Sequence, residues 1–415
     1  MQIILLNRFF TPDTSAASQL VSDLSRHLVN CGYTVTVITS RRCSDNSYSP
    51  LPAREEIDGV HVVRGPRLGF GQGALVARAL NYLAFAVFAR GQLARLVRPG
   101  DVVVEMTDPP LLSAWLLSSL SATAARVHWH QDLVPEVAYA TGVLSTRGWL
   151  GRYAASRRDT RLGCARSHVV VNEGMGERLL ERGVAPERLH VIHNWALPVL
   201  EPASDPRLDG GEQRYCGAEL RAQFGLTDEF VVAYSGNFGR VHEFDMLLSA
   251  LSELASERRI RFFLIGQGMR YGVLRQAVRA AGLENVVFAP HPPVARLAQV
   301  LSLADAHLVS LRPEVERLAM PSKLYSIAAL GKPIIAIVEP SGEVGTLVRE
   351  HRCGAVVAPG DTQALVGAIL AMANDAKVTS DAGINARTLY EARFPRASAL
   401  EQWRALIARM AATAS

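Results

Sequence analysis

The feature that most constrains the fold is an alternation of apolar runs and helical patterns at the start of the chain. Residues 2–7 are predicted as a strand around the apolar run 3–6, residues 15–30 carry apolar side chains at helical spacing, and residues 34–39 are all β-branched. A strand, a helix and a second strand in this order predict a crossover connection and parallel pairing. The sequence therefore predicts an α/β domain with a Rossmann-like sheet.

The same alternation begins again near residue 230, after a polar, Pro- and Gly-containing stretch over 201–216 that is typical of a linker. Predominantly apolar segments at 230–235, 261–265 and 306–310 are predicted as strands, and helical patterns separate them. A chain of 415 residues is also too long for one ordinary core. We expect the α/β class with two Rossmann-like domains. The expected parts are residues 1–196, residues 197–394, and a helix over 395–415 that packs back toward the first domain.

Within the first half, the patterns predict a loop over 44–56 and helices over 74–97, 111–125 and 148–166. The last of these helices is strongly basic, since only Asp159 balances its arginines, which are Arg152, Arg157, Arg158, Arg161 and Arg166. Such a helix suits an anionic membrane surface. A solvated basic face is the alternative, which the sequence leaves open.

The net charge has the same distribution. Residues 1–196 contain 21 Arg, no Lys and 16 acidic residues, and the rest of the chain holds 23 basic and 23 acidic residues. The net charge of +5 therefore belongs to the first half. A basic half is compatible with nucleic acid, anionic lipid or a phosphorylated substrate as partner.

Cysteine usage and apolar runs indicate the compartment. The 5 cysteines are scattered without metal-ligand spacing, which is typical of free thiols in a reducing cytosol. The first residues lack the basic region and cleavage site of a signal peptide, and no run approaches the roughly 20 apolar residues of a spanning helix. We expect a cytoplasmic protein, with peripheral attachment to the inner face of the plasma membrane as a further expectation.

One stretch of the second half, residues 311–337, predicts a loop, a helix, a turn and a buried strand. Pro321 and Ser322 are typical of a helix start, and Lys323 follows them directly. A helix N-terminus presents free N–H groups and partial positive charge, which attract anions. An ordinary capped βα unit would have the same pattern, so the stretch alone leaves both interpretations open.

Two further loops should reach the same edge of the second sheet. They are S-G-N-F-G-R at 235–240 and I-G-Q-G at 265–268, whose glycines let a ligand approach the backbone and whose Arg240 can neutralise phosphate. The three loops together predict a pocket for a diphosphate. No G-x-G-x-x-G follows the first strand of either half and no G-x-x-x-x-G-K-[ST] occurs, which argues against a dinucleotide oxidoreductase and a P-loop NTPase.

In the first half, His130, Asp132 and Glu136 follow the end of a predicted strand. His130 could deprotonate a hydroxyl, with Asp132 orienting it. The alternative is that His128 and His130 only pack or form hydrogen bonds within the strand. The loop before the helix over 15–30 predicts either an acceptor or phosphate loop or a plain capped turn.

The order and spacing of several motifs carry a family resemblance over nearly the whole chain. The chain resembles the retaining glycosyltransferases of family 4, which have the GT-B architecture of two Rossmann-like domains facing each other across a cleft. It is most similar to the bacterial branch that builds lipopolysaccharide, capsule or exopolysaccharide from nucleotide sugars, often on lipid-linked acceptors. The motifs are F-F-T-P-D at 9–13, G-Y-T-V-T-V-I-T at 32–39, Q-D-L-V-P-E at 131–136, V-I-H-N-W at 191–195, Y-S-G-N-F-G-R-V-H-E-F-D at 234–245, F-L-I-G-Q-G at 263–268, A-D-A-H-L-V-S-L at 304–311, P-S-K-L-Y at 321–325, A-L-G-K-P at 329–333 and G-A-V-V-A-P-G-D at 354–361.

The resemblance implies an acceptor-binding first domain and a donor-binding second domain, and it assigns roles to residues. The donor-binding residues it implies are Gly236, Asn237 and Arg240 for the diphosphate, Ser322, Lys323 and Leu324 for phosphates or ribose, and Gly266 and His291 near the nucleotide. His130 and Asp132 would face the acceptor and the transferring sugar. Glu136 would belong to the acceptor side, with Thr14 and Ser15. Thr14, Ser15 and Ala16 replace the usual Gly-Gly of this first loop.

One departure from the family concerns two glutamates separated by seven residues, whose matching positions here are Leu318 and Ser326. Glu316 is the nearest substitute for the first, in a catalytic role, and Glu343 could bind the ribose in place of the second.

The activity implied by the resemblance is transfer of a sugar with retention at the anomeric carbon. No Asp-x-Asp motif stands in a metal-binding context, so we expect no metal and no cofactor beyond the donor substrate. The expected partners are a nucleotide sugar, a saccharide or lipid-linked acceptor, and an anionic membrane in peripheral contact, with no nucleic acid. A sugar-nucleotide epimerase and a non-catalytic sugar-nucleotide-binding scaffold remain as alternatives.

Overall fold

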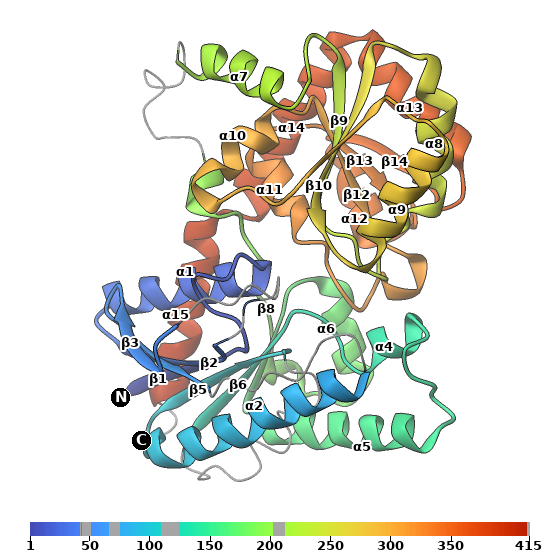
Figure 1. Cartoon of the computed structure of the whole chain (residues 1–415). Helices are drawn as coiled ribbons and strands as arrows, with labels where there is room; N and C mark the ends of the chain where they lie inside the picture. The colour runs from blue at the N-terminus through green and yellow to red at the C-terminus, as the bar shows by residue number, and fades with distance from the viewer. Residues whose placement is uncertain (42, 44–50, 66–74, 109–123, 202–211, 413–415) are drawn as a thin grey trace. The chain divides into compact units, whose positions relative to one another are not determined.

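The computed structural model describes the chain except for residues 42, 44–50, 66–74, 109–123, 202–211 and 413–415. It divides into two compact units (Figure 1). The first unit comprises Met1–Asn194, Leu318–Met320 and Ala397–Ser415, and the second comprises Trp195–Arg317 and Pro321–Arg396. The division expected from the sequence lies between residues 196 and 197, and the inclusion of Leu318–Met320 in the first unit was not expected.

The N-terminal unit contains one sheet of eight strands in the order β3-β4-β2-β1-β5-β6-β7-β8. Neighbouring strands are parallel except for the antiparallel pair β3 and β4 at one edge. The strands are β1 (Gln2–Leu6), β2 (Thr34–Thr39), β3 (Arg54–Ile57), β4 (Val60–Arg64), β5 (Val102–Met106), β6 (Ala125–His130), β7 (Ser167–Val170) and β8 (Leu189–Val191).

The loop predicted over 44–56 is wrong at its end, because β3 begins at Arg54. Its sequence R-E-E-I lacks an apolar face, so nothing in it indicated a strand, and charged side chains of this kind protect a sheet edge from further pairing. The helix predicted over 111–125 falls mostly outside the described residues, and Ala125 begins β6 instead.

Helices cover this sheet and fill its core. The helices of the unit are α1 (Ala16–Asn30), α2 (Leu75–Leu96), α4 (Glu136–Ala140), α5 (Trp149–Cys164), α6 (Glu173–Leu180), the 3-10 turn η1 (Pro186–Arg188) and α15 (Arg396–Ala412). Helix α15 comes from the far end of the chain, yet its Trp403 packs against Trp129 of β6 with 4.7 Å between the ring centroids. Both rings are fully buried, so the last helix completes the core of the first unit.

The C-terminal unit contains an all-parallel sheet of six strands in the order β11-β10-β9-β12-β13-β14. The strands are β9 (Phe230–Asn237), β10 (Ile260–Gln267), β11 (Val286–Ala289), β12 (Ala306–Ser310), β13 (Ile334–Ile337) and β14 (Gly354–Val357). The strand order reverses between β9 and β12, and ligands of open α/β sheets bind at the carboxyl ends of strands at such a reversal.

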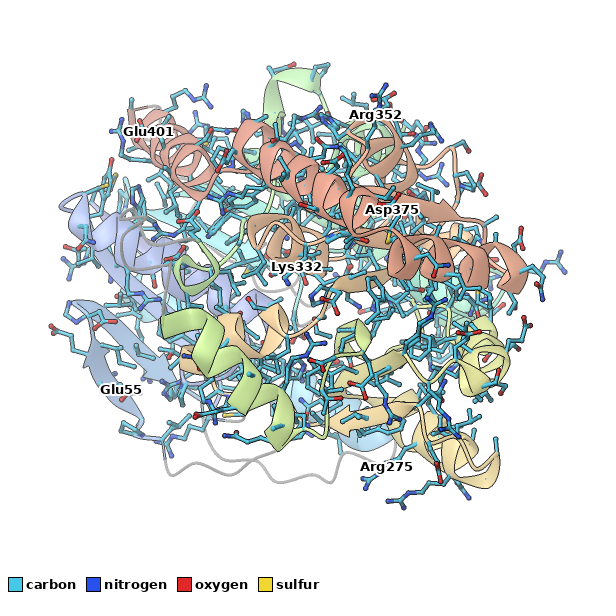
Figure 2. The ribbon with its side chains drawn as sticks, turned by 90° about the horizontal axis from the view of Figure 1, so that it is seen from above. Glu55, Arg275, Lys332, Arg352, Asp375 and Glu401 are labelled. Atoms are coloured by element: carbon cyan, nitrogen blue, oxygen red, sulfur yellow. The ribbon has the colours of Figure 1, made fainter. Side chains whose placement is uncertain are left out.

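The helices of this unit are α7 (Glu212–Gln223), α8 (Asp245–Glu253), α9 (Met269–Ala280), α10 (Leu297–Ser302), α11 (Lys323–Ala329), α12 (Glu343–Glu350), α13 (Thr362–Asn374) and α14 (Ala376–Arg393), with 3-10 turns at Pro198–Leu200, Leu254–Ser256, Val294–Arg296 and Pro313–Val315. Helix α7 begins inside the stretch predicted as a linker, so that prediction is wrong from Glu212 on. Asp375, labelled in Figure 2, starts α14 by accepting hydrogen bonds from the backbone N–H groups of Lys377 and Val378. Among the helices that the structure describes, none is long and apolar enough to cross a bilayer.

Candidate functional site

Two glycines lie side by side where β9 and β10 end. Gly236 and Gly266 are register partners in the parallel pair, with φ angles of 132° and 144°. A Cβ atom on Gly266 would stand 2.0 Å from the carbonyl oxygen of Gly236, so no side chain fits there. Glycine at 266 therefore lets the two strand ends approach closely, and Gly236 presents its backbone without a side chain on the strand that borders the reversal.

Lys323, the first residue of α11, reaches this place. Its side chain is only partly buried, but its Nζ atom is fully buried and has no hydrogen-bond partner among the described residues. Nζ lies 3.5 Å from the centre of the Tyr234 ring, and a Cβ on Gly236 would be 3.6 Å from Nζ. Burial holds the pKa of Lys323 well below its usual range. A buried ammonium without an acceptor fits an anion that is not part of the chain.

Two histidines lie within the electrostatic reach of Lys323. His242 is buried and its Nδ1–H donates to the carbonyl oxygen of Ser310 over 2.6 Å. Burial, and then the charge of Lys323, lower the pKa of His242 to about 3. The pKa of His291 is lowered by the same two causes in the same order. Both imidazoles are therefore held neutral beside Lys323. A bound anion would oppose the effect of the Lys323 charge and raise both pKa values.

The other predicted donor residues differ in their surroundings. Arg240 and Asn237 are exposed near the end of β9. Ser322 precedes α11 but makes no capping hydrogen bond with its side chain. Leu324 is fully buried, and its backbone N–H donates to the carbonyl oxygen of Pro321, so this residue has neither its side chain nor its N–H available to a phosphate.

Glu316 lies at the start of α12. Its carboxylate faces the backbone N–H groups of Val344 and Glu343 and occupies the space that a Cβ on Gly342 would need. Burial raises the pKa of Glu316 to about 7, against those N–H groups, which lower it, while the nearby carboxylates of Glu343 and Glu339 raise it further. Glu316 and Glu343 thus meet at one helix start, although they are distant in sequence.

In the N-terminal unit, Asp132 follows β6 and forms an isolated bridge with Ala319. Asp132 is exposed along part of its surface. Desolvation by the surrounding protein, and then repulsion from Asp108, nevertheless raise the pKa of Asp132 to about 6. His130 ends β6 and is 3% exposed. Its Nε2 lies 3.1 Å from Nδ1 of His168.

The predicted acceptor residues divide into two kinds. Thr14 is exposed and Ser15 is partly exposed in the turn before α1, where the backbone N–H of Ser15 donates to the Asp13 carboxylate. Glu136 is buried, and its carboxylate pairs with Arg158 at 2.6 Å and Arg182 at 2.7 Å. These ion pairs connect α4, α5 and the end of α6, so Glu136 has a structural role.

Three parts of these sites could not be found from sequence alone. His242 and Tyr234 lie within one motif, but nothing in the sequence showed that both lie beside Lys323. The cysteines have no metal-ligand spacing, yet His128, His130 and His168 offer ligand atoms that all lie within 4.8 Å of one another. The alternation of His128 and His130 was the available signal, and the third ligand lies on another strand.

Comparisons with known proteins agree with this fold. Residues 15–195 match the family model described as glycosyl transferase 4-like domain, and residues 229–375 match the model described as glycosyl transferases group 1. A putative colanic acid biosynthesis glycosyl transferase of Escherichia coli strain K12 is 26% identical over 385 residues, which cover 89% of this chain and 91% of the relative.

Two solved structures share the fold along their whole length. The sucrose-phosphate synthase of Thermosynechococcus elongatus has a TM-score of 0.74 at 18% identity, with 100% of each chain covered. The Anabaena protein HepE, solved in complex with UDP and glucose, has a TM-score of 0.72 at 17% identity, with 99% of this chain and 100% of that chain covered. With a 4-like domain in its first half and a group 1 domain in its second, the chain belongs to the GT-B glycosyltransferases.

Proposed function

We propose that this glycosyltransferase moves a sugar from a nucleoside-diphosphate sugar to a saccharide or lipid-linked acceptor during the synthesis of a cell-surface polysaccharide. The observation that carries the donor class is the buried Nζ of Lys323, which has no hydrogen-bond partner in the described part of the chain and lies beside the backbone of Gly236. The name of the Escherichia coli relative supports the polysaccharide, and the UDP and glucose bound to HepE support the donor.

In this proposal the donor diphosphate accepts a hydrogen bond from Lys323 and lies along Gly236 and Gly266. Arg240, exposed at the same strand end, closes on the opposite side of the phosphates. Charge that develops on the leaving diphosphate is then stabilised by groups already in place, which lowers the barrier to transfer. We propose that these two cations replace a metal ion at the diphosphate, and that transfer proceeds with retention, as the family resemblance implies.

We propose that Asp132 contacts the transferring sugar or the acceptor. Glu316 and Glu343 act as a pair at the start of α12, where Glu316 fixes the helix start and Glu343 reaches the ribose. His130 as general base remains a prediction. Its Nε2 already lies 3.1 Å from Nδ1 of His168.

The acceptor side is proposed to work at a membrane. Helix α5 exposes Trp149 and Tyr153 at 71% and 55%, beside Arg147 and Arg152, which are also exposed. Aromatic rings flanked by arginines bind the interface of an anionic bilayer. The protein should sediment together with vesicles that contain anionic lipid at low salt, and it should be released from them at high salt. Trp149→Ser should reduce the fraction of protein that sediments with the vesicles. Met269→Ser on the exposed face of α9 is the control, and equal sedimentation with neutral vesicles would contradict the proposal.

A thermal-shift screen with UDP, GDP, ADP, CMP and their common sugars tests the donor site. A ligand that binds only the folded protein raises the melting temperature by mass action. We expect a shift with one nucleoside diphosphate and its sugar, and we expect Arg240→Ala to reduce it. No shift with any of these compounds would contradict the proposed pocket.

Product analysis separates the alternatives. Turnover of the donor sugar without an acceptor would indicate an epimerase. Binding of the donor with neither sugar transfer nor slow hydrolysis would indicate a scaffold. NMR of the product that shows inversion at the anomeric carbon would refute retention.

A further inference from the structure

Four titratable side chains share one face of the N-terminal sheet. The register pairs Glu105 of β5 with His128 of β6, and His128 with His168 of β7. His130 lies two residues after His128 and therefore on the same face. The exposed fractions of Glu105, His128, His130 and His168 are 1%, 0%, 3% and 0%. Four side chains that carry metal-ligand atoms are therefore buried together in the core.

Two of the distances among these side chains are close to the edge of a metal tetrahedron. Nε2 of His128 lies 3.3 Å from Oε2 of Glu105, and Nε2 of His130 lies 3.1 Å from Nδ1 of His168. Two ligands bound to zinc at 2.0–2.1 Å in tetrahedral geometry are roughly 3.3 Å apart. The histidine ligand atoms all lie within 4.8 Å of one another, so small ring rotations would bring them onto one ion.

The outer hydrogen bond of His168 also fits a metal ligand. Its Nε2 lies 3.2 Å from the carbonyl oxygen of Leu162, so Nε2–H is the donor and Nδ1 keeps its lone pair. Histidines that bind metals characteristically donate their other ring N–H to a carbonyl or carboxylate, which fixes the tautomer and the ring orientation.

We propose that Glu105, His128, His130 and His168 bind one divalent transition-metal ion, with zinc the best match for a set of three imidazoles and one carboxylate. Magnesium and calcium prefer oxygen ligands and are disfavoured. The four protein ligands leave no open position, so the ion is structural and ties β5, β6 and β7 together. The inference is independent of the donor site, and it assigns His130 to the metal in place of a general base.

Metal analysis of the full chain, purified with a tag that lacks histidine and from zinc-containing medium, tests the proposal. We expect about one zinc ion per chain. Removal of zinc with a chelator should lower the melting temperature, and its return should restore it. Cobalt substitution should give the intense visible absorption of a tetrahedral site. A wild-type chain that holds no zinc and melts unchanged with zinc or chelator would overturn the proposal.

Variants locate the ion. His168→Gln should reduce zinc affinity at least about tenfold. The matched control is His307→Gln, since His307 is also fully buried and its Nε2 also faces a carbonyl, that of Leu301 at 3.0 Å, but in the C-terminal unit. The control should keep its zinc and its response to chelator. Zinc retained by His168→Gln at full stoichiometry would overturn the site. The donor-induced thermal shift of the wild type measures the proposed function separately, so the two failures are distinguishable.

Discussion

Replacing Lys323 with Met should make the ligand-free protein more stable and the donor complex weaker. The substitution keeps an unbranched side chain that is one atom shorter, and it removes an ammonium whose nitrogen is buried without a hydrogen-bond partner in the described part of the chain. Retaining such a group costs stability, whereas binding an anion requires it. The two effects of one substitution therefore have opposite signs.

The size of the stability gain follows from the surroundings of Nζ. The effective penalty for a buried ion is several kcal/mol, and the contact between Nζ and the Tyr234 ring at 3.5 Å returns up to about 2 kcal/mol. A net gain of about 2 kcal/mol should raise the melting temperature of the C-terminal unit by about 4–8 °C. Loss of a charged hydrogen bond to phosphate should weaken donor binding by about 10- to 100-fold.

Differential scanning calorimetry without ligand and titration calorimetry with the donor measure the two effects. Lys332→Met is the matched control, because Lys332 (Figure 2) belongs to the same unit but its Nζ donates to the carbonyl oxygen of Ser302 over 3.0 Å. The control should lose stability or stay unchanged, and it should bind the donor as the wild type does. A lower melting temperature for Lys323→Met than for the wild type would refute the reasoning, since it would show that the ammonium is well paired.

Three further predictions concern stability. The pKa of Glu316 is raised from 4.5 to about 7, so the folded protein binds the proton more tightly than the unfolded chain does. The free energy of unfolding should therefore fall by about 2 kcal/mol, after allowance for partial exposure, as pH rises between these values. Glu316→Gln should remove this pH dependence of the melting temperature from pH 4.5 to 8, and parallel pH curves for the variant and the wild type would contradict the prediction. Gly266→Ala should lower the free energy of unfolding in urea by about 3 kcal/mol, because its Cβ would meet the Gly236 carbonyl at 2.0 Å. Gly272→Ala in α9 has open space around its Cβ and should raise this free energy by up to about 1 kcal/mol. Trp403→Ala should cost about 3–5 kcal/mol, and exposed Trp149→Ala should change stability by less than about 0.5 kcal/mol.

Local pattern was sufficient for most elements and for part of the site. The strands at 34–39 and 306–310 have the predicted bounds, because β-branched and apolar runs identify buried strands without tertiary information. Strand β3 and helix α7 were missed because their polar sequences carry no periodic apolar face. The glycine loops and Lys323 could be proposed from sequence because their chemistry is local.

Contacts between distant segments could not be predicted in this way. Lys323 meets Tyr234 because the strand order reverses between β9 and β12, and Glu316 meets Glu343 through the fold of the intervening strand. The cluster on β5, β6 and β7 depends on strand register, which pairs His128 with His168 forty residues later. Register is set by the packed sheet as a whole.

The contact between Trp129 and Trp403 also affects the order in which the two units can finish folding during synthesis. The N-terminal unit receives its last helix only after the entire C-terminal unit has been synthesised. At about 5–20 residues per second, the Trp129 side of the sheet waits roughly 15–55 s for its partner. During that interval the nascent chain exposes an apolar sheet face, which makes it a substrate for chaperones while its second half is already able to fold.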